Sequence, residues 1–245
     1  MGMGQAVRVQ WGFVSAAAEV LQAPKELGFK LAGHGEIAQV LKDSEELQQA
    51  AKHGSEAFTT WFPLAYYHLR RTMKKLAARD PTIAPPFPGS VYPTACANLG
   101  PHMCCHWHHD VNNYPGAPCW ILALGNYNSK LGGHLVLPQL RMYIEFPAGA
   151  SILLSSAGIK HGNTSLQPGE KRYSFTQYCP GGLLRYVAYG FRLAREVQDP
   201  KVRQAMEERA GETWKQQYAR FSTSASLVRY RQWVRSQEAL EALIL

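Results

Sequence analysis

The residues best suited to bind a metal ion are a histidine and an aspartate two positions apart, His108 and Asp110, together with a second histidine, His161. Side chains i and i+2 of a strand point to the same face, so the first two can reach one metal ion together. Two histidines and one carboxylate on one face of Fe(II) leave positions open for a cosubstrate and O2. The spacing therefore predicts an iron site formed by these three side chains.

Three other histidines compete for this role. In a regular strand His106 shares a face with His108, so it is either an alternative ligand or a supporting residue. His109 points the other way, and His134 lies further along the chain. We prefer His108 because it alone stands two residues before the carboxylate.

A second pattern follows the distal histidine, where Arg172 and Ser174 share one face of a predicted strand. A guanidinium binds a carboxylate in bidentate fashion, and a serine hydroxyl can add a hydrogen bond to the same group. The pair is predicted to hold the distal carboxylate of 2-oxoglutarate; the alternative is an ordinary strand with solvent-facing polar residues. Two roles stay open for Asn98: a contact with the keto-acid end of 2-oxoglutarate, or a structural one.

These side chains need a β framework to position them. Between residues 92 and 192, short apolar segments alternate with Gly, Pro and Asn turns. Many short strands at this spacing predict a double-stranded β-helix, that is, a jelly-roll, cupin-like core. The expected strands are Thr94 to Asn98, Met103 to His109, Cys119 to Leu124, His134 to Leu137, Arg141 to Phe146, Ser151 to Ser155, Arg172 to Tyr178 and Leu184 to Tyr189.

The segments on either side of this block are predicted to be helical, which gives an α+β chain. We expect one domain over residues 1–245, with a mainly helical part at 1–91, the β core at 92–192 and a helical part at 193–245. Asp199 and Pro200 have the form of an N-cap and a first helical residue. The expected helices are Glu36 to Ala51, Leu64 to Arg79, Lys201 to Arg220 and Leu227 to Leu243.

Composition indicates the type of binding partner and the cellular compartment of the protein. The net charge of +8 favours an anionic partner such as nucleic acid, although a generic basic surface is the alternative. No stretch approaches the roughly 18 apolar residues that span a bilayer, and the first residues do not have the form of a signal peptide. Five cysteines without a CxxC pair suit reduced thiols. We expect an intracellular protein, nuclear or cytoplasmic, with no membrane partner.

Several segments, in order, resemble the TET/J-binding-protein class of Fe(II)/2-oxoglutarate oxygenases, and most of all the branch expanded in mushroom-forming fungi. The resemblance covers residues 92–192 and a helical tail of similar style. The matching segments are 108–113, 132–135, 144–149, 161–163, 169–178, 181–183 and 189–192.

The resemblance implies a double-stranded β-helix that uses Fe(II), 2-oxoglutarate and O2 to oxidise a methylated base such as 5-methylcytosine in DNA. Asn112, Asn113 and Asn163 stand at positions that are often polar in the class. His109 stands where close relatives have arginine, and we assign these four residues to the substrate. Tyr114 follows the metal-binding motif and is predicted to stack on the base.

Two other functions remain open on the sequence. The same chemistry can act on a small metabolite or a protein side chain, or the fold can be a binding module without turnover. The complete triad and the Arg-x-Ser pair argue against the binding module. Basic residues on one predicted helix suit phosphate contacts, or simply a solvated face; they are Arg70, Arg71, Lys74 and Lys75.

Overall fold

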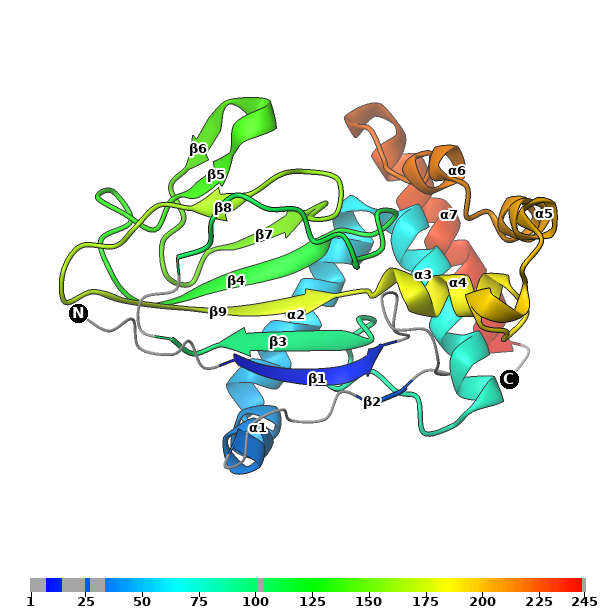
Figure 1. The fold of residues 1–245 in the computed structure, drawn as a ribbon, viewed down its shortest axis with the longest axis horizontal. Coiled ribbons are helices and arrows are strands. Elements are labelled where there is room, and N and C mark those ends of the chain that lie inside the picture. Colours follow the sequence, from blue (N-terminus) through cyan, green and yellow to red (C-terminus); the bar gives the residue numbers. More distant parts are fainter. Residues whose placement is uncertain (1–7, 15–24, 27–33, 101–103, 244–245) are drawn as a thin grey trace.

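The computed structural model describes residues 8–14, 25–26, 34–100 and 104–243. A six-stranded antiparallel sheet and a smaller three-stranded sheet form its β part, and α2 lies behind the larger sheet (Figure 1). The strands are β1 (Arg8–Val14), β2 (Lys25–Glu26), β3 (Thr94–Asn98), β4 (Cys119–Asn126), β5 (Leu135–Leu137), β6 (Met142–Ile144), β7 (Ser151–Leu154), β8 (Gly162–Asn163) and β9 (Lys171–Tyr178). The helices are α1 (His34–Asp43), α2 (Glu45–Trp61), α3 (Pro63–Arg79), α4 (Gly181–Ala188), α5 (Pro200–Ala210), α6 (Trp214–Tyr218) and α7 (Ser224–Leu243), with 3-10 turns η1 (Pro138–Leu140) and η2 (Ala194–Glu196).

Strand β9 occupies the middle of the larger sheet, whose order is β2-β1-β3-β9-β4-β7. It pairs with β3 on one side, where Asn98 lies opposite Ser174, and with β4 on the other. The smaller sheet has the order β6-β5-β8. Mixed helices and antiparallel sheets therefore agree with the expected α+β class.

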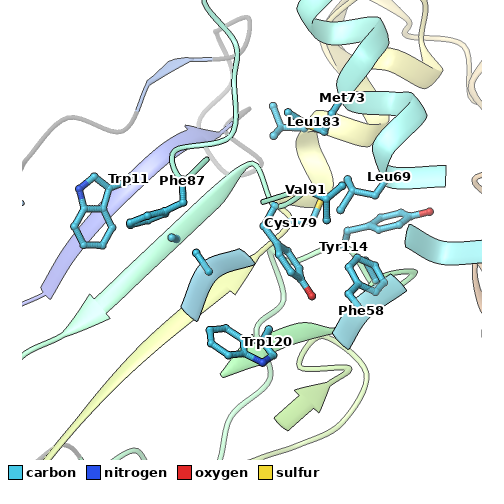
Figure 2. Close-up of a cluster of buried hydrophobic side chains, with 14 of the residues drawn as sticks. Trp11, Phe58, Leu69, Met73, Phe87, Val91, Tyr114, Trp120, Cys179 and Leu183 are labelled. Carbon is cyan, nitrogen blue, oxygen red and sulfur yellow. The ribbon is translucent and has the colours of Figure 1, made fainter. Parts of the chain in front are cut away.

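The main core lies between the larger sheet and the helices behind it. Alternation along the central strands sends Trp120 of β4 and Phe175 of β9 into this core, where both are almost fully buried. Figure 2 shows Trp120 among the buried side chains of this core. Gly54 of α2 provides the space for the indole, because a Cβ atom there would lie 2.6 Å from an indole carbon. The neighbouring residues on the same strands consequently face the opposite side of the sheet, toward the smaller sheet.

Local capping chemistry sets the helix boundaries. The Ser44 hydroxyl accepts a hydrogen bond from the Leu47 amide at 3.2 Å, so a new helix starts there and the expected Glu36 to Ala51 helix is two helices. Pro63 opens α3, close to the predicted Leu64 to Arg79. Asp199 caps α5 as predicted, but Gly211, with φ of 77°, ends that helix in a left-handed conformation. The expected helix to Arg220 is therefore broken into α5 and α6.

Other predictions also differ from the structure. The first part of the chain contributes a strand, β1, to the larger sheet, which the prediction of a mainly helical part at 1–91 did not include. The predicted strand Leu184 to Tyr189 belongs to α4, because a short apolar run does not distinguish a buried helix from a strand. The predicted strand Met103 to His109 forms only an isolated bridge at His108, and its first residue lies outside the described residues.

None of the helices in the described ranges has the length and apolar character needed to cross a membrane.

Candidate metal centre and adjoining cavity

Three side chains predicted as metal ligands lie together in the structure. The Nε2 atom of His108 is 3.4 Å from Oδ1 of Asp110, and Nε2 of His161 is 3.8 Å from Oδ2 of the same carboxylate. The ligand atoms of the three residues all lie within 4.8 Å of one another. Two imidazole nitrogens and a carboxylate oxygen in one cluster are the donor set of an iron facial triad.

Backbone pairing brings these residues together across the sequence. His108 and His161 form an antiparallel bridge with two backbone hydrogen bonds, of 2.9 and 3.0 Å. The amide of Asp110 donates to the Ser156 carbonyl at 3.0 Å, and the Asn113 side chain donates to the Asp110 carboxylate at 3.1 Å. His108 and Asp110 are thus brought together by a bridge and a turn, and not by the regular strand that we predicted.

Hydrogen bonds at the other ring nitrogens fix how both histidines face the cluster. Nδ1 of His108 lies 2.7 Å from the His106 carbonyl, and Nδ1 of His161 lies 3.0 Å from the Ile159 carbonyl. A carbonyl only accepts, so each Nδ1 carries the hydrogen and each Nε2 presents its lone pair near Asp110. Burial lowers the pKa of His161, which favours the neutral, metal-binding form. The residues fit a divalent metal ion.

A cavity of about 490 Å³ adjoins the cluster and lies between the two sheets. Every second residue of β9 faces it, beginning with Arg172 and Ser174 and continuing to Thr176 and Tyr178. The smaller sheet contributes Leu135 on the opposite side. The three clustered side chains and the predicted 2-oxoglutarate residues therefore share one chamber.

Arg172 is a buried cation in this cavity. Only 6% of the residue is exposed, its Nε has no hydrogen-bond partner, and its guanidinium lies 5.9 Å from the centre of the Phe146 ring. Within the described part of the chain it forms no ion pair. Beside it, Ser174 accepts a hydrogen bond from the Asn98 side chain at 2.9 Å, which leaves the serine hydroxyl able to donate elsewhere. A buried cation and a hydroxyl donor suit an anionic group in the cavity.

The residues assigned to the substrate divide into two groups. His109, Asn112, Asn113 and Asn163 line the cavity. Tyr114 does not: it is 4% exposed, its hydroxyl donates to Glu212 at 2.7 Å, and that oxygen accepts from Arg220 at 2.7 Å. The structure therefore gives it a structural role and not a place beside a substrate.

The competing histidines lie elsewhere. His106 is exposed in a small surface depression beside Lys160. Nδ1 of His134 forms a hydrogen bond with the Thr164 hydroxyl at 3.1 Å. Neither lines the cavity.

Sequence reasoning missed several residues of the cavity wall. Thr176 and Tyr178 follow Arg172 and Ser174 at the same strand spacing, so alternation alone would have placed them there. Gln10 reaches the cavity from β1, and its amide donates to the Tyr178 hydroxyl at 3.4 Å. No local signal identifies Gln10, because its strand pairs with a partner more than eighty residues away.

Comparisons with known proteins add information on the fold. No protein-family model matches the sequence, and no curated protein matches it. Among solved structures, NgTET1 in complex with 5mC DNA matches with a TM-score of 0.53 and 16% identity, over 71% of this chain and 60% of that chain. A viral collagen prolyl hydroxylase, vCPH from Paramecium Bursaria Chlorella virus-1 in a 2OG complex, matches at a TM-score of 0.28 and 11% identity, over 44% and 69%.

The NgTET1 match shows a shared fold over the matched region. It confirms, at the level of the fold, the resemblance to the TET/J-binding-protein class, while the fungal branch stays a prediction. The chain spans about three-fifths of the length of that protein. The prolyl hydroxylase match is too weak to carry an argument.

Proposed function

We propose that this chain is an Fe(II)- and 2-oxoglutarate-dependent dioxygenase with a double-stranded β-helix core, and that it oxidises the methyl group of a modified base such as 5-methylcytosine in DNA. One observation carries the proposal: a buried arginine, with no acidic partner among the described residues, shares a cavity with a cluster of two histidines and one aspartate. The shared fold and the resemblance in the sequence support the choice of substrate.

His108, Asp110 and His161 would hold the iron, which with 2-oxoglutarate and O2 supplies the oxidising power for hydroxylation of a C–H bond. The protein contributes orientation and charge. Hydrogen bonds donated by both Nδ1 atoms to backbone carbonyls keep the Nε2 lone pairs near the carboxylate. The side-chain amide of Asn113 donates to the Asp110 carboxylate and so helps to orient it.

Arg172 and Ser174 would bind the distal carboxylate of 2-oxoglutarate. A bidentate contact satisfies the buried guanidinium, and the serine hydroxyl adds a donor that Asn98 orients. The cosubstrate would then lie in the cavity between β9 and the metal cluster. Of the two roles left open for Asn98, this proposal takes the structural one: Asn98 orients the Ser174 hydroxyl.

His109, Asn112, Asn113 and Asn163 would contact the base. Their donors and acceptors suit the polar edge of a pyrimidine. The net charge of +8 favours a polyanion, but part of the basic α3 helix is already paired, since Arg70 and Lys74 both contact Glu241 of α7. The phosphate contacts are therefore expected from exposed cations near the cavity more than from these two.

The cosubstrate assignment is tested by succinate formation from 2-oxoglutarate. Arg172→Ala removes two charge-assisted hydrogen bonds, which at about 1.5 kcal/mol each raises the required 2-oxoglutarate concentration about 100-fold. Arg172→Lys keeps the charge but not the fork, and falls between. Iron affinity should change little, and Arg209→Ala, an exposed arginine on α5, is the matched control. Equal losses in iron and 2-oxoglutarate binding would contradict this role.

The triad and the substrate are tested separately. Asp110→Ala or His161→Ala should abolish turnover, and survival of turnover would refute the metal assignment. The substrate is tested by mass spectrometry of methylated duplex DNA after incubation with iron, 2-oxoglutarate and O2. Oxidised 5-methylcytosine supports the proposal. Consumption of 2-oxoglutarate on a metabolite or peptide, with unmodified DNA, would favour the alternative hydroxylase.

A further inference from the structure

The hairpin that joins β5 to β6 carries an unusual group of exposed side chains at its tip. Leu140, Met142 and Tyr143 are 52%, 46% and 68% exposed, and Arg141 between them is also exposed. Three large apolar residues and one cation in a run of four resemble a contact surface more than an ordinary turn. Strand β6 is also an edge strand of the smaller sheet.

Arg141 adopts a backbone conformation that an arginine rarely takes. Its φ and ψ are 52° and 41°, the left-handed region that glycine and asparagine occupy at lower cost. Its amide ends η1 by donating to the Pro138 carbonyl at 3.1 Å, which requires only the backbone. Within the described residues its side chain has no hydrogen bond or ion pair. An arginine at a strained position with no internal partner is grounds for a functional hypothesis.

Strand register places this tip at the metal end of the cavity. Val136 of β5 lies opposite Gly162 of β8, so the antiparallel run brings the end of β5 beside His161. The Gln139 side chain accepts a hydrogen bond from the Lys160 amide at 2.6 Å, one residue before that histidine. Figure 1 shows the hairpin rising from β8 on the side away from the larger sheet.

We propose that this hairpin tip is a wedge that enters the base stack of duplex DNA and fills the space of the base delivered to the cavity. The inference rests on the proposed function and deepens it, because a base inside a duplex must be extruded before oxidation. Apolar side chains such as leucine and methionine unstack base steps in this way, and an arginine beside them neutralises phosphate or enters the minor groove. The excess of positive charge on the chain, +8, complements DNA.

The test compares oxidation of 5-methylcytosine in a duplex and in the same single strand, which needs no wedge. Arg141→Gly removes the side chain while keeping a residue suited to the backbone, so folding should be preserved. Leu140→Ala shortens the apolar tip. Both variants should lose at least about tenfold of duplex activity and keep single-strand activity within about twofold. Leu131→Ala is the matched control, since this leucine is 61% exposed in the turn before β5, at the other end of that strand.

A second measurement does not depend on turnover. Wild-type protein should raise the fluorescence of 2-aminopurine placed next to the target base in a duplex, and Arg141→Gly should not. If the ratio of duplex to single-strand activity is the same in all variants, the wedge is refuted while the proposed function stands. If wild-type protein oxidises neither the duplex nor the single strand, the proposed function and the wedge are both refuted. A hairpin variant that changes only the oligomeric state would show that β6 pairs with a second copy, and would also overturn the wedge.

Discussion

The hydroxyl of Tyr114 provides a sharp test of how the C-terminal helices are held against the metal-binding loop. It donates to Glu212 and accepts from Arg220, both at 2.7 Å, and Glu212 in turn contacts His68 of α3 at 2.5 Å. Tyr114→Phe removes both contacts of the hydroxyl and keeps the buried ring. The change therefore isolates hydrogen bonding from packing.

The expected magnitude follows from the partners. A hydrogen bond to a charged group contributes about 1.5–3 kcal/mol, and Glu212 is 9% exposed, so water replaces the lost donor poorly. We expect the free energy of unfolding to fall by about 3 kcal/mol in total. In a chain of this length each kcal/mol lowers the melting temperature by about 2–4 °C, which gives about 6–12 °C.

Unfolding is measured by urea denaturation and by calorimetry. Tyr186→Phe is the control: this half-buried tyrosine packs its ring against Phe191, and no hydrogen bond of its hydroxyl is found in the described structure. Its removal should change the free energy of unfolding by less than about 0.5 kcal/mol. If Tyr114→Phe and Tyr186→Phe have the same effect, the buried network does not hold the C-terminal helices.

Three further predictions concern stability and reactivity. Gly54→Ala should destabilise the fold by about 2 kcal/mol, because the new Cβ would lie 2.6 Å from an indole carbon of β4. Burial raises the pKa of the Cys119 thiol to about 12, so alkylation at pH 8 should label the exposed Cys104 and spare Cys119 until the protein unfolds. A hydrogen bond from Lys74 lowers the pKa of Glu241 to about 2, so its stabilisation is present above pH 4.5 and is lost as the pH falls toward 2; with 26% of the side chain exposed, Glu241→Gln should cost about 1 kcal/mol at pH 7.

A specific outcome would contradict each of these three predictions. Unchanged stability of Gly54→Ala would mean that α2 can move away from the sheet. Rapid labelling of Cys119 in folded protein, measured by mass spectrometry, would show that its side chain is accessible. The difference in the free energy of unfolding between wild type and Glu241→Gln should disappear as the pH falls toward 2. A difference that stays constant between pH 7 and pH 2 would contradict the ionic origin of the contact.

The sequence anticipated that Arg172 and Ser174 share a cavity with the cluster of histidines and aspartate, since spacing and side-chain chemistry are local properties. Arg172 and Ser174 face one cavity because β9 is a regular strand, as alternation required. His108 and Asp110 lie together for another reason: a bridge and a turn that no periodicity encodes.

Other features depend on contacts between distant segments. Tyr114 lies close in sequence to the metal-binding motif, yet its partners Glu212 and Arg220 are about a hundred residues away and turn it from the cavity. The apolar run in α4 could form a strand or a helix, and burial of Leu183 and Leu184 against the main core accompanies the helix. Tertiary packing decided both outcomes.

The two-faced use of β9 has a consequence for attempts to redesign substrate choice. Its odd-numbered residues Phe175 and Gln177 sit in the core, so insertions or changes of register would exchange the cavity wall with the core. Val111 and Asn112, on an exposed loop at the cavity, carry no such constraint. Randomised libraries should therefore tolerate diversity in this loop and lose folded members when β9 is varied, so that new specificities arise by directed evolution at the rim of the chamber and not on its inner wall.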